Sequence, residues 1–181
     1  MTLYKRLCKI KAKKVSDTCS KHIGKDLLDV GAGRCYIAKE LKERNSTEVT
    51  CIDVKDLNET ELNLVVYNGD KIPFNDSRFT TVLLAYVLHH CDDPLDILKE
   101  CKRVCNGKIV IFEDKPGIFA NMLDYVYNAL HGVKTPFNLK TEHEWLQLFK
   151  QLNLRVVEKR DNVEKQWFYP FVRHTMFVLQ K

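Results

Sequence analysis

The stretch that decides the fold of this chain is residues 26–36, which read DLLDVGAGRCY. A short apolar run reaches a carboxylate, passes through two glycines one residue apart and opens into a helical pattern over residues 33–44. A strand, a tight turn and a helix in this order place backbone N–H groups and a helix N-terminus beside a crevice. The stretch therefore predicts a ligand-binding turn, and the alternative is a tight turn that binds nothing.

Two common ligands of such a turn are disfavoured by its residues. The dinucleotide fingerprint requires a glycine or alanine three positions after Gly33, where this chain has the much larger Tyr36. A Walker phosphate loop requires a Gly-Lys-Ser or Gly-Lys-Thr sequence, which does not follow here. S-adenosylmethionine is the remaining common user of the turn, and its ammonium group would favour the carboxylate of Asp29 at the end of the strand.

The composition is that of an ordinary globular protein. The 181 residues are 45% hydrophobic and 29% charged, so we expect one domain over residues 1–181 with a sizeable core. The sequence shows no apolar run of membrane-spanning length and no apolar signal segment. The seven cysteines form no CxxC pair and join no histidine cluster, so we expect reduced thiols, no metal site and a cytoplasmic protein.

The first 25 residues carry many lysines and arginines, within a net charge of +5 for the chain. Leu3, Leu7 and Ile10 recur there on one helical stripe. We predict a basic amphipathic helix within residues 1–24 that packs this stripe on the domain and leaves its lysines in solvent. The alternative is a contact with nucleic acid or with an anionic membrane surface.

Strand and helix patterns alternate along the rest of the chain. Strands are predicted at residues 26–30, 48–53, 63–67, 79–85, 108–112, 155–158 and 172–179. Helices are predicted at residues 33–44, 57–62, 94–104, 118–130 and 142–152. Asp93 and Thr141 are the expected caps of the helices that follow them. This alternation favours an α/β fold in the form of a three-layer sandwich.

Two further carboxylates suit the nucleoside part of S-adenosylmethionine. Asp53 ends the second strand 20 residues after Gly33, which is the spacing of an acid that accepts from ribose hydroxyls. Asp70 lies in a turn where it would accept from the exocyclic amine of adenine, while Ile72 packs on the ring face. The alternative is an ordinary Gly-Asp turn followed by a proline.

Taken together, the successive motifs carry a family resemblance. LLDVGAGRCYIAKEL, CIDV, NGDKIPFNDSRFTTVLLAYVLHHCDDP and IVIFED resemble, in order, the motifs of class I S-adenosylmethionine-dependent methyltransferases. The branch they resemble most includes the small-molecule ubiquinone and menaquinone C-methyltransferases, and the resemblance covers about residues 25 to 115. It implies a Rossmann-like, seven-stranded, mostly parallel sheet with a reversed last strand. It also implies S-adenosylmethionine as the cofactor and S-adenosylhomocysteine as the product.

The resemblance further implies which residues contact the cofactor. These are Asp29, Gly31, Ala32, Gly33, Asp53, Val54, Asp70, Lys71, Ile72, Ala85 and Tyr86. The chain departs from the family at Cys35, where a third glycine is common. A side chain at this position would crowd the turn, which bears on cofactor affinity.

Methyl transfer from a sulfonium is an in-line displacement with an activated leaving group, so the protein mainly aligns the reactants and excludes water. A general base is needed where the acceptor must lose a proton. His89, His90 and Glu113 lie at the carboxyl ends of predicted strands and are the candidates for this role. The alternative for each is a structural one, as a hydrogen-bonded turn histidine or a capping carboxylate.

The acceptor is predicted from weaker signals. No Asn-Pro-Pro-Tyr-type motif and no Pro-Cys pair mark the chain as a nucleic acid methyltransferase, which favours a small molecule. A lid-like helical segment at residues 117–153 and an aromatic cluster at residues 167–171 suit an apolar or aromatic acceptor. The alternatives are an RNA methyltransferase and a non-catalytic cofactor-binding or interaction protein of the same fold. The sequence leaves the oligomeric state open.

Overall fold

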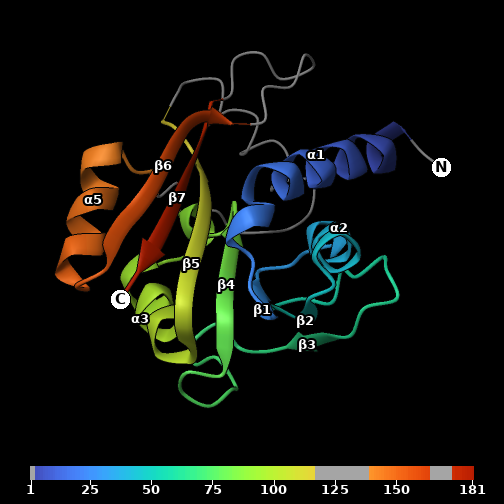
Figure 1. The fold of residues 1–181 in the computed structure, drawn as a ribbon, viewed down its shortest axis with the longest axis horizontal. Helices are drawn as coiled ribbons and strands as arrows, with labels where there is room; N and C mark the ends of the chain where they lie inside the picture. The colour runs from blue at the N-terminus through green and yellow to red at the C-terminus, as the bar shows by residue number, and fades with distance from the viewer. Residues whose placement is uncertain (1–2, 117–138, 164–172) are drawn as a thin grey trace.

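The computed structural model describes residues 3–116, 139–163 and 173–181. Within these residues the strands form one sheet (Figure 1). In chain order they are β1 (Asp26–Val30), β2 (Glu48–Asp53), β3 (Leu64–Val66), β4 (Phe79–Ala85), β5 (Cys105–Asp114), β6 (Arg155–Val163) and β7 (His174–Gln180). The helices are α1 (Leu3–Cys19), α2 (Tyr36–Asn45), α3 (Pro94–Val104) and α5 (Glu142–Gln151), with short 3₁₀ helices η1 (Ser20–His22) and η2 (Leu88–His90).

The seven strands lie in the order β3-β2-β1-β4-β5-β7-β6. Neighbouring strands from β3 to β5 pair in parallel, whereas β7 lies antiparallel between β5 and β6. This arrangement confirms the mostly parallel sheet with a reversed last strand. The chain adds β2 and β3 on one side of β1 and then β4 and β5 on the other. Such a switch of direction opens a crevice outside the carboxyl ends of β1 and β4.

Helices cover both faces of the sheet, which confirms the predicted three-layer α/β sandwich (Figure 1). Helices α3 and α5 contribute Ile97 and Trp145 to a core that includes Leu28 of β1. On the opposite face, α1 contributes Val15 to a core that includes the adjacent Leu27. Neighbouring residues of β1 thus enter different cores, as expected for a parallel strand buried on both faces.

The two helices on the α3 side begin where the sequence predicts. The Asp93 carboxylate accepts a hydrogen bond from the Leu95 N–H at 2.8 Å, and Pro94 occupies the first turn of α3. Thr141 and Glu144 form a capping box at the start of α5. These caps satisfy backbone N–H groups that have no partner within their own helix.

Residues 57–62 do not form the predicted helix. The side-chain oxygen of Asn58 accepts from both the backbone N–H and the hydroxyl of Thr60 at 2.8 Å. The Thr60 hydroxyl accepts from the Leu62 N–H at 3.2 Å. Short polar side chains that bond to nearby backbone groups compete with helical hydrogen bonds, which explains the error.

Strand β5 begins at Cys105, earlier than the predicted residue 108. Within the added residues, a Cβ atom on Gly107 would lie 2.3 Å from the Thr80 carbonyl oxygen. The glycine therefore permits a close approach of two strands here. Strand β6 also runs further than predicted, to Val163. The helix predicted at residues 118–130, most of the lid-like segment and the cluster at residues 167–171 lie outside the described residues.

Helix α1 exists as predicted but packs on the domain with a different face. Its buried residues are Ala12, Val15, Ser16 and Cys19. Leu3, from the stripe predicted to be buried, is 73% exposed, and Ile10 is 37% exposed. Small side chains allow α1 to lie close to its neighbours, and the hydrophobic pattern alone favoured the larger residues.

Candidate functional site

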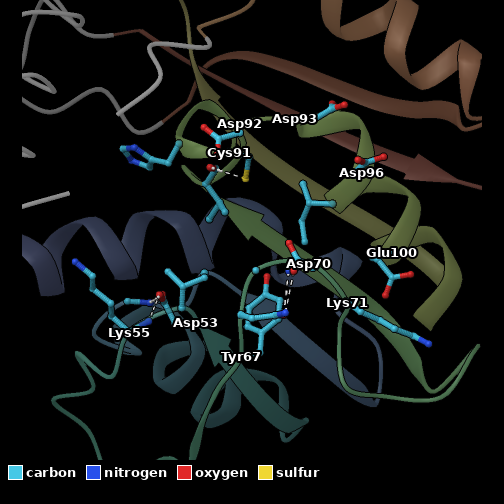
Figure 2. A pocket seen from close by; sticks show the side chains of 18 of the residues that line it. Asp53, Lys55, Tyr67, Asp70, Lys71, Cys91, Asp92, Asp93, Asp96 and Glu100 are labelled. Carbon is cyan, nitrogen blue, oxygen red and sulfur yellow. Dashed lines mark hydrogen bonds between the residues drawn. The ribbon is translucent and has the colours of Figure 1, made fainter. Parts of the chain in front are cut away.

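A pocket of about 930 Å³ opens at the carboxyl ends of the central strands, where the topology predicts a crevice (Figure 2). Eight of the predicted site residues line it, namely Gly31, Gly33, Asp53, Val54, Asp70, Lys71, Tyr86 and His90. Asp29, Ala32, Ile72, Ala85, His89 and Glu113 lie outside this lining. The structure thus gathers most of the predicted cofactor contacts and separates two of the three predicted catalytic residues from the pocket.

The turn between β1 and α2 requires its glycines. Gly31 and Gly33 have φ angles of +69° and +51°, which favour glycine. A Cβ atom on Gly31 would lie 2.5 Å from a methyl carbon of Val87. The N–H groups of Gly31 and Ala32 both donate to the Ile52 carbonyl of β2, at 2.8 and 3.1 Å. The turn is therefore held against the next strand, and its backbone borders the pocket.

Cys35 shows why a third glycine suits this turn. It precedes α2 with a φ angle of 60° in the left-handed region, and its side chain is fully buried. A side chain costs about 1–2 kcal/mol in this conformation. The turn keeps a conformation that suits glycine although a cysteine occupies the position.

Asp53 connects the end of β2 to the turn. Its carboxylate accepts from the Gly33 N–H at 2.8 Å and from the Lys55 N–H at 3.2 Å. These bonds place the carboxylate at the pocket wall and attach the turn a second time to the end of β2 (Figure 2). The predicted spacing of 20 residues therefore corresponds to a direct contact.

Asp29 lies beneath the turn, with 2% of its surface exposed. Burial raises the pKa of this carboxyl group to about 8, and the negative charge of Asp53 adds to the effect. A buried carboxyl group in this state is protonated at neutral pH. A positive charge placed nearby would favour its ionised form.

The third wall of the pocket comes from the segment after β3. Asp70 and Lys71 line it, and Asp70 accepts from the side-chain amide of Asn68 at 2.9 Å. The prediction that the Ile72 side chain packs on an adenine ring is wrong, because this side chain is fully buried in the core. Its N–H donates to the Glu100 carboxylate of α3 at 2.9 Å, which holds the segment against that helix.

The segment after β4 contributes Tyr86, which has a φ angle of 64° and lines the pocket. Its N–H donates to the Phe112 carbonyl of β5 at 2.8 Å. The ammonium group of Lys11, from α1, lies 3.3 Å from the centre of the Tyr86 ring. Ala85, predicted to contact the cofactor, packs against the core on the α1 side.

Glu113 and His89 form a buried pair behind this segment. Glu113 is 1% exposed and accepts from the N–H groups of Val87 and Leu88 at 3.1 and 2.8 Å. Its other oxygen lies 2.6 Å from Nδ1 of His89, which is 2% exposed. The predicted general-base role does not fit residues enclosed in this way. The pair fixes the backbone that carries the pocket wall.

His90 is the member of the predicted catalytic group that lines the pocket. Burial lowers the pKa of its imidazole to about 4, and the neighbouring charge of His89 adds to the effect. The centres of the His89 and His90 imidazole rings lie 4.0 Å apart. Its buried Nδ1 has no hydrogen-bond partner within the described part of the chain. The ring is therefore neutral at physiological pH.

Sequence reasoning missed an acidic wall formed by η2 and α3. Asp92, Asp93, Asp96 and Glu100 line the pocket along this side, across from Asp53 and Lys55 (Figure 2). The sequence DDPLD gave a usable signal, because acidic residues gather in the first turn of a helix. Tyr67 was also missed, and burial raises the pKa of its phenol well above the usual range.

Residues 28–111 match the family model of a methyltransferase domain. The matched residues run from β1 into β5, and the chain is similar there to a class I S-adenosylmethionine-dependent methyltransferase domain. The finer assignment to the ubiquinone and menaquinone branch stays a prediction.

A curated protein similar to this chain is the tRNA U34 carboxymethyltransferase of Nautilia profundicola. The two are 26% identical over 153 residues, which are 75% of this chain and 50% of the relative. The chain thus spans about half the length of that protein.

Solved structures confirm the fold. A methyltransferase bound to the Trm112 methyltransferase activator from Haloferax volcanii aligns with a TM-score of 0.73 and 14% identity, over 97% of this chain and 93% of that one. The geranyl diphosphate C-methyltransferase of Streptomyces coelicolor, solved with S-adenosylhomocysteine, aligns with a TM-score of 0.70 and 14% identity. That alignment covers 92% of this chain and 78% of the other.

The residues of the pocket fit S-adenosylmethionine as the cofactor. Gly33 leaves open space in the pocket where a Cβ would project, Asp53 presents a carboxylate at the wall, and Asp29 buries a carboxyl group that a cation would ionise. Among the described residues, no group of three His, Cys, Asp or Glu side chains is arranged to hold a metal ion. No helix in the described ranges is both long and apolar enough to span a bilayer.

Proposed function

We propose that this protein transfers the methyl group of S-adenosylmethionine to a small-molecule acceptor. The observation that supports this most is the convergence of the glycine turn, Asp53 and Tyr86 on one pocket at the switch point of the sheet. When bound, S-adenosylmethionine supplies a methyl group on a sulfonium, which is an activated leaving group. The protein then contributes binding, alignment and the exclusion of water.

Different residues around the pocket would bind different parts of the cofactor. Asp53 would accept from the ribose hydroxyls, and Asp70 and Lys71 would contact the adenine. The backbone of residues 31–33 would face the amino acid end. The negative charge of Asp29 would stabilise the ammonium group from beneath the turn, since burial leaves this charge without solvent screening.

We propose separate roles for the three predicted catalytic residues. Glu113 and His89 act as positioning residues, because they hold the backbone of the segment after β4 rather than face the pocket. His90 faces the acceptor as a neutral imidazole. Its low pKa keeps a second positive charge away from the cationic cofactor and leaves a lone pair that can accept a hydrogen bond from the acceptor.

The acidic wall supports an acceptor that is not a polyanion. Asp92, Asp93 and Asp96 would repel a phosphate backbone entering along this side of the pocket. An uncharged or cationic small molecule meets no such barrier. The acidic wall therefore favours the same small-molecule acceptor that the motifs after β4 predict.

An RNA acceptor is the second candidate function. It is supported by the 26% identity to a tRNA U34 carboxymethyltransferase and by the basic residues of α1. In this case the basic helix, on the other side of the pocket from the acidic wall, would receive the phosphates.

The two candidates are separated by labelling. Calorimetric titration of the full chain with S-adenosylhomocysteine comes first, with saturable binding as the expected result. Methyl-labelled S-adenosylmethionine is then incubated with the protein and a cell extract, which is divided into small-molecule and RNA fractions. We expect label in the small-molecule fraction that ribonuclease treatment does not remove, and the Asp53→Ala variant should reduce it strongly at limiting cofactor.

Three results would contradict the proposal in different ways. Ribonuclease-sensitive label would assign the protein to RNA. Binding of S-adenosylhomocysteine without label in either fraction would identify a non-catalytic cofactor-binding protein. A folded protein that binds neither S-adenosylmethionine nor its product would overturn the cofactor assignment itself.

A further inference from the structure

The N-terminal half of α1 carries an apolar stripe whose ends, Leu3 and Ile10, are exposed and whose middle residue, Leu7, is partly buried. Leu3, Leu7 and Ile10 follow the spacing i, i+4 and i+7, which places them on one line along a helix. Leu3 is 73% exposed and Ile10 is 37% exposed. The buried residues Ala12 and Val15 lie on the opposite side of the same helix.

Contacts on the inner side of α1 fix the direction in which this stripe faces. Lys5 forms an ion pair with Glu59 at 3.0 Å, and the ring of Tyr4 lies 5.1 Å from the Arg34 guanidinium. Lys9 lies 5.7 Å from the centre of a tyrosine ring on α2. In Figure 1 this half of α1 runs outward past α2, toward the end marked N. The stripe therefore faces away from the domain because its helix is tied down from behind.

Cations border the stripe. At about 100° per residue, Arg6 and Lys13 run along one side of it and Lys11 lies along the other. Arg6 and Lys13 are exposed. An aliphatic line between rows of cations is the pattern of a helix that lies in the plane of a membrane surface. A face that binds RNA presents cations and stacking groups, and an aliphatic centre line adds nothing to phosphate binding.

We propose that the N-terminal half of α1 is an anchor for the surface of an anionic lipid bilayer. Leu3, Leu7 and Ile10 enter the boundary between headgroups and acyl chains. Arg6 and Lys13 contact the lipid phosphates from the side. Because the proposal depends on the outer face of α1, it holds whether or not the pocket transfers methyl groups.

Lys11 connects the proposed anchor to the pocket. Lys11 follows the apolar stripe on the same helix, and its ammonium group lies 3.3 Å from the centre of the Tyr86 ring at the pocket wall. Lys11 directly follows Ile10 in the sequence, so a helix held at the membrane surface places the Tyr86 wall of the pocket near the lipid. An acceptor that partitions into the bilayer would have a short path to the pocket.

The test is co-sedimentation of the full chain with vesicles. Mixed vesicles of phosphatidylcholine and phosphatidylglycerol are compared with vesicles of phosphatidylcholine alone. We expect binding to the mixed vesicles, weakened by salt, and little binding to the neutral ones. The double variant Leu3→Gln/Ile10→Gln should lower the partition coefficient about tenfold or more while it keeps every charge.

A control variant replaces two other exposed apolar residues, which lie away from α1. Val65 and Val157 are each 40% exposed, on β3 and β6, and Val65→Gln/Val157→Gln should leave vesicle binding unchanged. Far-ultraviolet circular dichroism and S-adenosylhomocysteine binding check that both double variants are folded. The charge variant Arg6→Gln/Lys13→Gln should lose most of the preference for phosphatidylglycerol.

Several outcomes would overturn the proposal. One is a wild-type chain that does not sediment with the mixed vesicles, and another is an equal loss in the control variant. Binding to a tRNA mixture that the charge variant loses and the stripe variant keeps, without vesicle binding, would assign the face to RNA. Self-association in solution that only Leu3→Gln/Ile10→Gln abolishes would assign the stripe to a second copy of the chain.

Discussion

Two strands of the sheet, β1 and β5, each bury a carboxyl group near their carboxyl end. The surroundings of these two groups differ in charge and in hydrogen bonding. Asp29 of β1 is 2% exposed, and burial beside the negative charge of Asp53 raises its pKa to about 8. Glu113 of β5 is 1% exposed and receives hydrogen bonds from Val87, Leu88 and His89. One group lacks positive charge around it, and the other has its partners within the fold.

The difference indicates that Asp29 serves cofactor binding and that Glu113 serves the stability of the fold. A buried charge that is fully hydrogen-bonded stabilises the conformation around it, and removing it leaves several donors without a partner. A buried carboxyl group close to another carboxylate is costly to ionise until a cation arrives. We therefore expect Glu113 to matter most for folding and the Asp29–Asp53 side to matter most for the cofactor.

We expect the largest effect on stability from Glu113, whose hydrogen bonds give it a structural role. Glu113→Ala should lower the free energy of unfolding by about 3–5 kcal/mol, because it removes the acceptor of the Val87 and Leu88 N–H groups and the buried partner of the His89 Nδ1 atom. Urea denaturation followed by circular dichroism measures the loss. Glu113→Gln keeps an acceptor oxygen and should lose less. A mutant of wild-type stability with impaired methyl transfer would reverse the assignment and make Glu113 a catalytic residue.

Asp53→Ala tests the cofactor side. We expect S-adenosylhomocysteine binding to weaken by roughly 1.5–3 kcal/mol, because charge-assisted hydrogen bonds to the ribose are lost along with the anchor of the Gly33 N–H. Asp56→Ala, in the exposed loop that follows, is the matched control and should leave the affinity unchanged. Calorimetry measures both variants. Unchanged binding by a folded Asp53→Ala protein would remove the ribose role.

Asp29 predicts a dependence on pH. With a pKa of about 8, the group is protonated at pH 7 in the free protein, and a bound ammonium ion lowers that pKa. Binding of S-adenosylmethionine at pH 7 should therefore release a proton from Asp29. The affinity should rise between pH 6 and pH 8 by at most about tenfold, or 1.4 kcal/mol, per pH unit.

Calorimetry in two buffers of different ionisation enthalpy measures this proton release. Asp29→Asn removes the titrating group, so the release attributable to it should disappear while ionisation of the ligand itself remains. An identical release in wild type and variant would mean that Asp29 keeps its proton, and the contrast with Glu113 would then be one of position alone.

The smallest effect concerns the turn itself. Because Cys35 has a φ angle of 60°, Cys35→Gly should be more stable than Cys35→Ala by about 0.5–1 kcal/mol, which reverses the usual preference for alanine. Both variants lose the buried sulfur, so thermal unfolding of the pair isolates the backbone term. A more stable alanine variant would show that the left-handed conformation is not retained.

Most of the cofactor side could be predicted from the sequence because its signals are local. The apolar run before Gly31 fixes β1, and the spacing to Asp53 reflects one strand, one helix and one strand of ordinary length. The side-chain direction of Ile72 was not predictable in this way. It depends on the Glu100 carboxylate of α3, which lies 28 positions further along the chain.

The other errors have a similar origin. The partners that enclose His89 come from β5, so the sequence shows a histidine at a strand end but not its burial. The face that α1 buries is set by how closely α1 can approach the domain, which selects Ala12 and Ser16 over Leu3. Hydrophobic periodicity identifies the helix, and only tertiary packing selects its inner side.

The place of β7 has a consequence for the way the molecule is made. This strand lies between β5 and β6, so β6 joins the sheet only through a neighbour that follows it in the chain. While a ribosome is translating residues 155–173, the side of β5 that will pair with β7 is still an open edge. Open edges of this kind invite pairing with other chains. The interval before β7 emerges is therefore when the nascent protein is most exposed to aggregation.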